Sequence, residues 1–160
     1  MIARWIAVNV TVVVIIAVWA FSKGYDSSYV LIGKIIAQAA FMLYLINLNM
    51  YFVFLLIRKS TIRDVKVKLA KISKKMMKYH IPFAITASLL IGVHAVIMAY
   101  VRREDFWIWK TGTGVLSLII LAVLLYSGLS RHRKATGRRR RFHYGMAFVF
   151  FSIVILHVFL

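Results

Sequence analysis

Four of the five histidines in this 160-residue chain occur in two matching frames. Each frame is a histidine, thirteen mostly apolar residues and a second histidine; one runs from His80 to His94 and the other from His143 to His157. On an α-helix, fourteen residues bring the second side chain back to within about 40° of the first, roughly 21 Å further along the axis. Two such helices side by side would offer two facing histidine pairs at two depths. Two stacked haems, each with two histidine ligands, require this arrangement.

Other metal centres fit the spacing poorly. Two histidines about 21 Å apart on one helix cannot share an ion, and two helices give two sites of two histidines each. Structural zinc takes four protein ligands and catalytic zinc three, whereas a haem iron needs only two axial ligands. The chain has no cysteine, which excludes iron–sulfur clusters, disulfides and thioether-attached haem. The predicted cofactors are therefore two haem b groups held without covalent attachment.

The composition predicts an all-α integral membrane protein. Hydrophobic residues make up 62% of the chain, well above the share in soluble domains. A membrane-spanning helix needs about 20 apolar residues. We expect a single transmembrane haem-binding domain over residues 1–160, with five crossing helices at about Trp5–Phe21, Ile35–Ile57, Ile81–Val101, Gly114–Leu129 and Phe142–Leu160.

The net charge of +18 is concentrated in two loops, since residues 58–78 hold nine of the 22 basic residues and residues 131–141 hold seven. Basic loops lie on the cytoplasmic side, so the chain is predicted to begin inside and end outside. A nucleic-acid-binding protein would need a soluble module to present its basic face, and the sequence has none. The organism is not evident, but such loops suit a prokaryotic plasma membrane.

The first basic loop is itself patterned. Apolar residues recur there in steps of three and four, which predicts an amphipathic cytoplasmic helix between the second and third crossings. Such a helix would lie on the anionic membrane surface. It could also dock a cytoplasmic flavoprotein. The residues of the stripe are Ile62, Val65, Leu69, Ile72, Met76 and Tyr79.

Small and basic residues flank the histidines. Gly92 lies two residues before His94, and Gly145 lies two residues after His143. A position without a side chain would let a flat macrocycle approach the helix, although helix packing explains such glycines equally well. Haem propionates need cationic partners, and interface anchoring is the alternative explanation for basic residues here. The candidate propionate partners are Arg140 and Arg141 near the inner histidines and Arg102 and Lys110 near the outer ones.

With H-x13-H on its third and fifth helices, the chain resembles the ferric-reductase-like transmembrane cytochromes, a family that includes ferric reductases and NADPH oxidases. The resemblance covers roughly residues 78–160. It implies that His80 and His143 hold the inner haem iron and that His94 and His157 hold the outer one. Family members commonly have a sixth helix, and many continue into a flavin and NAD(P)H domain. This chain has neither, nor a dinucleotide-binding fingerprint.

The resemblance implies an oxidoreductase or electron-transfer subunit that needs a separate reductase partner. Electrons would pass from a cytoplasmic-side donor, either a flavoprotein or quinol, to an outer acceptor such as ferric iron, oxygen or a redox protein. One alternative is a cytochrome that reduces a bound quinone and is fed from an outer donor such as superoxide. The other is a haem-free membrane protein for assembly or transport. The roles of Trp107, Trp109, Gln38, Asn47 and Asn49 are left open by the sequence.

Overall fold

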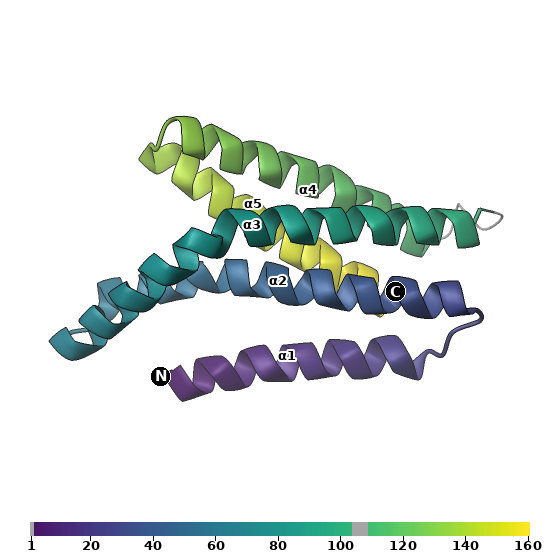
Figure 1. Cartoon of the computed structure of the whole chain (residues 1–160), viewed down its shortest axis with the longest axis horizontal. Coiled ribbons are helices and arrows are strands. Elements are labelled where there is room, and N and C mark those ends of the chain that lie inside the picture. The colour runs from purple at the N-terminus through teal and green to yellow at the C-terminus, as the bar shows by residue number, and fades with distance from the viewer. Residues whose placement is uncertain (1, 104–108) are drawn as a thin grey trace. The chain divides into compact units, whose positions relative to one another are not determined.

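The computed structural model describes residues 2–103 and 109–160, with side chains from Ala7 onward, so Trp107 lies outside the described residues. In these ranges the chain forms α-helices joined by short connections, without a strand, and the all-α prediction is confirmed. The helices, which Figure 1 labels in chain order, are α1 (Ile2–Ser22), α2 (Ser28–Lys59), α3 (Arg63–Val101), α4 (Trp109–Arg133) and α5 (Gly137–Phe159).

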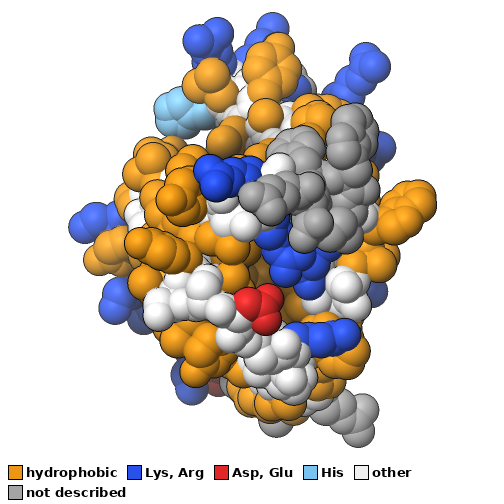
Figure 2. Space-filling view, turned by 90° about the vertical axis from the view of Figure 1, so that its right-hand side faces the viewer, with side chains coloured by type: hydrophobic (Ala, Val, Ile, Leu, Met, Phe, Trp, Pro, Cys, Tyr) orange, Lys and Arg blue, Asp and Glu red, His pale blue; other side chains and the backbone are white. Residues whose placement is uncertain are grey.

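Helices α2 to α5 are each long and apolar enough to cross a membrane. Even α5, with 23 residues, extends about 34 Å, compared with the roughly 30 Å of a bilayer hydrocarbon core. Large apolar side chains such as Leu89 and Val96 are more than 60% exposed, and hydrophobic side chains cover much of the face in Figure 2. The chain is thus an all-α protein of the integral membrane type. The described apolar part of α1, Ala7–Ser22, is shorter than a full span, and its crossing remains a prediction.

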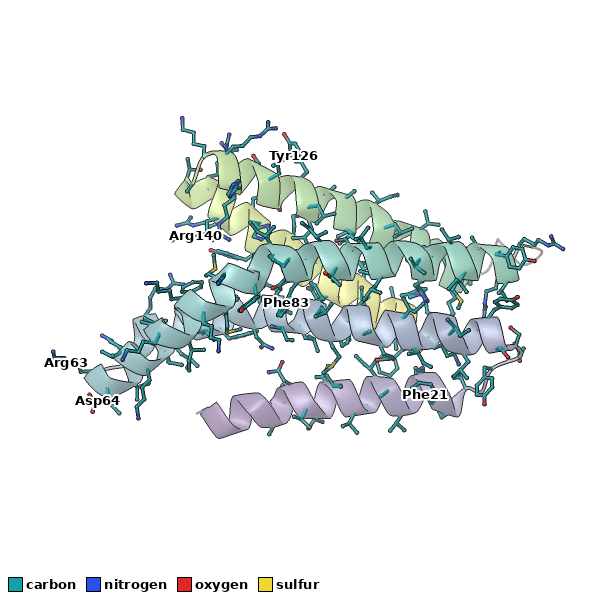
Figure 3. All side chains as sticks on the ribbon, viewed as in Figure 1. Phe21, Arg63, Asp64, Phe83, Tyr126 and Arg140 are labelled. Carbon is teal, nitrogen blue, oxygen red and sulfur yellow. The ribbon has the colours of Figure 1, made fainter. Side chains whose placement is uncertain are left out.

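Helix α3 corrects the expectation of a separate amphipathic helix. The amphipathic segment and the third apolar segment form one continuous helix of 39 residues, about 58 Å long. Figure 1 shows a bend along it, and Pro82 lies inside the helix. Proline lacks the backbone N–H and clashes with the carbonyl four residues earlier, so it bends a helix without having to end it. Figure 3 labels Arg63 and Asp64 at the N-terminal end of α3, where Asp64 complements the helix dipole.

The chain divides into two compact units. One unit is Ile32–His94, which holds most of α2 and of α3. The other holds α1, α4 and α5 together with the first residues of α2 and the last residues of α3. Each predicted histidine frame therefore falls within one unit.

A tight connection joins α4 to α5. Thr136 caps α5, and its side-chain oxygen accepts a hydrogen bond from the backbone N–H of Arg139 at 3.3 Å. The Arg139 guanidinium donates to the carbonyl of Ser130 at 2.8 Å, which also accepts from the backbone N–H of Lys134 at 3.3 Å. This contact ties the start of α5 to the end of α4. The two helices run antiparallel and side by side (Figure 1).

Helix α1 is attached to the end of α5. The indole Nε1 of Trp19 donates to the carbonyl of Val158 at 3.1 Å, and its ring lies 5.4 Å from that of Phe159. Carbonyls in the last turn of a helix have no partner within the helix. Trp19 donates a hydrogen bond to one of these carbonyls, that of Val158, which is next to His157 in the sequence.

Candidate functional site

His143 is half-buried in the first turns of α5 and is bonded to α4. Its Nδ1 lies 2.8 Å from the hydroxyl oxygen of Ser127. That hydroxyl donates to the carbonyl of Leu124 at 2.6 Å. A serine hydroxyl has one proton, which the short bond to Leu124 uses, so the serine oxygen accepts from His143 and Nδ1 carries the proton.

His157, also half-buried, repeats this arrangement at the other end of α5. Its Nδ1 lies 3.0 Å from the carbonyl oxygen of Lys110 and 3.2 Å from the hydroxyl oxygen of Thr113. The Thr113 hydroxyl lies 3.0 Å from the same carbonyl oxygen. A carbonyl oxygen can only accept, so Nδ1 of His157 carries its proton as well.

Glycines allow both imidazoles to lie close to the α4 backbone. A Cβ added to Gly128 would stand 3.3 Å from Cε1 of His143, and one added to Gly114 would stand 3.1 Å from Cε1 of His157. Each glycine directly follows the hydroxyl residue that contacts the same histidine. The hydroxyl–glycine pairs, Thr113-Gly114 and Ser127-Gly128, are fourteen residues apart, like the two histidines of α5. Antiparallel helices with equal spacing therefore place a hydroxyl and a glycine against each imidazole.

The unit Ile32–His94 contains the other frame. Nδ1 of His94 lies 2.9 Å from the carbonyl oxygen of Gly33 on α2, so this nitrogen again carries the proton. The Asn47 side-chain amide donates to the backbone carbonyl of His80 at 3.0 Å. Gly33 and Asn47 are also fourteen residues apart. Contacts from α2 to α3 thus follow the same interval as those from α4 to α5.

These hydrogen bonds fix the tautomer of His94, His143 and His157. In a neutral imidazole with the proton on Nδ1, the lone pair is on Nε2. Histidines that bind metal ions typically donate the other ring N–H to a carbonyl or similar acceptor, which fixes the tautomer and raises the basicity of the ligand. Three of the four predicted ligands therefore have the protonation pattern of an Nε2 metal ligand.

The residues predicted to accompany the histidines lie as follows. An added Cβ at Gly92 or Gly145 meets no heavy atom of the described chain within 4 Å, so the described fold has no steric need for glycine there. Arg140 and Arg141 are exposed on α5, and Figure 3 labels Arg140 in its first turns. Arg102 is half-buried just after α3. Lys110 contributes a contact that its charge did not predict, because its backbone carbonyl accepts from His157.

The partner residues on α2 and α4 were missed by the sequence reasoning, except that Asn47 was left open. The sequence does contain a signal for the two hydroxyl–glycine pairs of α4, because a hydroxyl residue followed by glycine recurs after fourteen residues, the same interval as between the histidines. The carbonyl partners Gly33 and Lys110 have no such signal, because every residue has a backbone carbonyl.

The donor set suits a metal that needs few protein ligands. In the part of the chain that the structure describes, no three side chains of His, Cys, Asp or Glu gather to hold an ion. An iron that already has four porphyrin nitrogens needs only two histidines, and the tautomer is fixed in three of the four histidines present. Comparison of the chain with protein-family models, curated proteins and solved structures finds no match.

Proposed function

We propose that this protein is a b-type dihaem membrane cytochrome that transfers electrons across a membrane. The observation that carries the proposal is the orientation of the histidines. Nδ1 of His143 and His157 donates to partners on α4 that share the fourteen-residue spacing, and Nδ1 of His94 donates to the carbonyl of Gly33. Regular packing alone does not require that these three histidines use Nδ1 in this way. Histidines that bind a metal ion through Nε2 typically do.

The chain's residues would have three tasks in this function. His80 with His143, and His94 with His157, would hold the two irons through Nε2, a pairing that rests on the family resemblance. Arg140 and Arg141 at one level, and Arg102 and Lys110 at the other, would pair with propionates. Apolar helix surfaces would keep water away. Haem, when bound, supplies reversible one-electron oxidation and reduction, and the protein tunes its potential.

The same proposal includes a five-crossing topology with the N-terminus inside and the C-terminus outside. Its support is the concentration of basic residues at the end of α2 and in the N-terminal part of α3, and again at the end of α4 and the start of α5. Gly137 and the four arginines after it form the start of α5. The membrane is proposed to be a prokaryotic plasma membrane.

We propose that a partner supplies the electrons. The chain carries no dinucleotide-binding fingerprint, so we propose a cytoplasmic flavoprotein reductase or membrane quinol as the donor. The acceptor on the outer side would be ferric iron, oxygen or a redox protein. The basic N-terminal part of α3, with lysines at positions 66, 68, 71, 74, 75 and 78, is the proposed contact for an acidic partner or for anionic lipid.

Single alanine variants of the four histidines test this proposal, with His132→Ala as the matched control because His132 is exposed at the end of α4. His94→Ala and His157→Ala should each lose one haem per chain and abolish transfer across proteoliposomes, while the inner site is still reduced. His80→Ala and His143→Ala should lose the other haem. Unchanged haem content in all four variants would refute the assignment.

A further inference from the structure

Ser127 is the most deeply buried hydroxyl group among the described residues, with 1% of its surface exposed. Its oxygen stands between two groups: it donates to the carbonyl of Leu124 at 2.6 Å and accepts from Nδ1 of His143 at 2.8 Å. Hydrogen bonds in series polarise one another. The donation to Leu124 therefore makes the serine oxygen a better acceptor for the histidine proton.

Thr113 occupies the equivalent position against His157 but has a different role. There the carbonyl of Lys110 itself accepts from Nδ1 of His157 at 3.0 Å, closer than the threonine oxygen at 3.2 Å. The equivalent carbonyl at the other level, that of Leu124, contacts the serine hydroxyl. Removal of the threonine hydroxyl would leave His157 its carbonyl acceptor, whereas removal of the serine hydroxyl would take away the oxygen that accepts from His143.

We infer that Ser127 is a positioning residue that lowers the reduction potential of the inner haem site by accepting the Nδ1 proton of His143. The inference rests on the proposed function. A hydrogen bond from Nδ1 makes the imidazole a more basic ligand, and a more basic ligand stabilises ferric over ferrous iron. Thr113 has no comparable influence at the outer site, because the Lys110 carbonyl makes the same contact.

The simpler interpretation is that Ser127 only satisfies its own helix. Serine hydroxyls in helices often bond a carbonyl three or four residues earlier. Ser117 does so on the same helix: it is 8% exposed, and its hydroxyl donates to the carbonyl of Thr113 at 2.8 Å. Ser117→Ala therefore controls for the loss of a buried helix hydroxyl.

The experiment is a spectroscopic redox titration of full-length protein with Ser127→Ala, Thr113→Ala, Ser117→Ala and Ser127→Thr, together with hemin titration of each haem-depleted protein. The redox transition that is missing from the titration of His94→Ala is assigned to the outer haem. In Ser127→Ala, hemin affinity at the inner site should fall about tenfold, at the lower end of the effect of outer-shell partners. The midpoint potential of the inner haem should rise by about 59 mV, which is the one-electron equivalent of a tenfold weaker preference of the site for ferric over ferrous haem.

Ser117→Ala should leave both midpoints unchanged. Thr113→Ala should shift the outer midpoint by less than Ser127→Ala shifts the inner one, because His157 keeps the Lys110 carbonyl as its acceptor. Ser127→Thr, which keeps the hydroxyl, should have midpoints close to those of the wild type. If Ser127→Ala does not accumulate, Ser127→Cys carries the same test, because its sulfur is a weak acceptor. Two bound haems with an unmoved inner midpoint would overturn the role of Ser127 and leave the proposed function intact. A wild-type chain that binds no haem would overturn both.

Discussion

The imidazole of His143 lies against the α4 backbone at Gly128, where a Cβ would stand 3.3 Å from the ring carbon Cε1. His157 has the same relationship to Gly114 at 3.1 Å. Both distances are shorter than ordinary van der Waals contacts. The two glycines therefore determine how closely each candidate ligand approaches its neighbouring helix.

Alanine at Gly114 or Gly128 should displace the imidazole and weaken haem binding. Overpacking of this kind lowers the free energy of unfolding by about 1–3 kcal/mol. The better helix propensity of alanine offsets up to about 1 kcal/mol of this loss. We expect lower haem content and a lower melting temperature for both variants. The measurements are haem per chain as the pyridine complex and thermal unfolding in detergent.

Gly112→Ala is the matched control for these two variants. Gly112 lies on the same helix, and an added Cβ there meets no described heavy atom within 4 Å. This variant should keep its haem and be as stable as wild type or slightly more stable. If Gly112→Ala and Gly114→Ala lost haem equally, contact with the histidine would not be the cause.

Larger side chains at Gly92 and Gly145 test whether the space beside them is used by the cofactor. Because an added Cβ meets nothing in the described chain at either position, Gly145→Leu and Gly92→Leu should leave the helical content unchanged, as circular dichroism measures it. A macrocycle next to these positions would be displaced, so haem content should fall. Full haem occupancy in both leucine variants would show that neither glycine faces the cofactor.

Removal of the Asn47 amide should loosen α3 near His80. Its hydrogen bond to the His80 carbonyl, at 3.0 Å, joins α2 to α3 close to Pro82. Such bonds between membrane helices contribute about 0.6 kcal/mol on average. Asn47→Leu should therefore unfold at a lower temperature and lose haem faster at the His80 site, in competition with excess apomyoglobin. Gln38→Leu, on the same helix, is the control, and equal effects of the two would contradict the assignment.

The absence of cysteine allows a direct test of topology, since any introduced thiol is unique. Lys71 and Lys134 are exposed residues of the two basic regions, and Lys23 is exposed just after α1. In intact spheroplasts, Lys23→Cys should react with a membrane-impermeant maleimide, whereas Lys71→Cys and Lys134→Cys should react only in inverted vesicles. The reverse pattern would invert the proposed orientation. Reaction of Lys23→Cys and Lys71→Cys from one side would contradict it as well.

The helical framework could largely be predicted from the sequence, because runs of about 20 apolar residues have few alternatives in a membrane. The boundary between the amphipathic segment and the third span was wrong for a physical reason. The stripe from Ile62 to Tyr79 and the span after it share the helical period, and neither glycine nor a capping residue separates them. Pro82 bends α3 but does not end it.

The four histidines of the candidate site could be selected from the sequence, whereas the residues that contact them could not. Histidine is rare enough within spans that a repeated interval stands out. Serine, threonine and glycine are common between membrane helices, so the recurrence of Thr113-Gly114 and Ser127-Gly128 at the histidine interval could be interpreted only from the contacts between α4 and α5. The carbonyl of Gly33 could be found in no other way than from the structure.

The most direct test of the central claim is the visible spectrum of detergent-purified protein, air-oxidised and then reduced with dithionite, with haem quantified as its pyridine complex. We expect sharp low-spin b-type bands and about two haems per chain, as bis-histidine ligation at both sites requires. A colourless protein that also fails to take up added hemin would contradict the dihaem assignment.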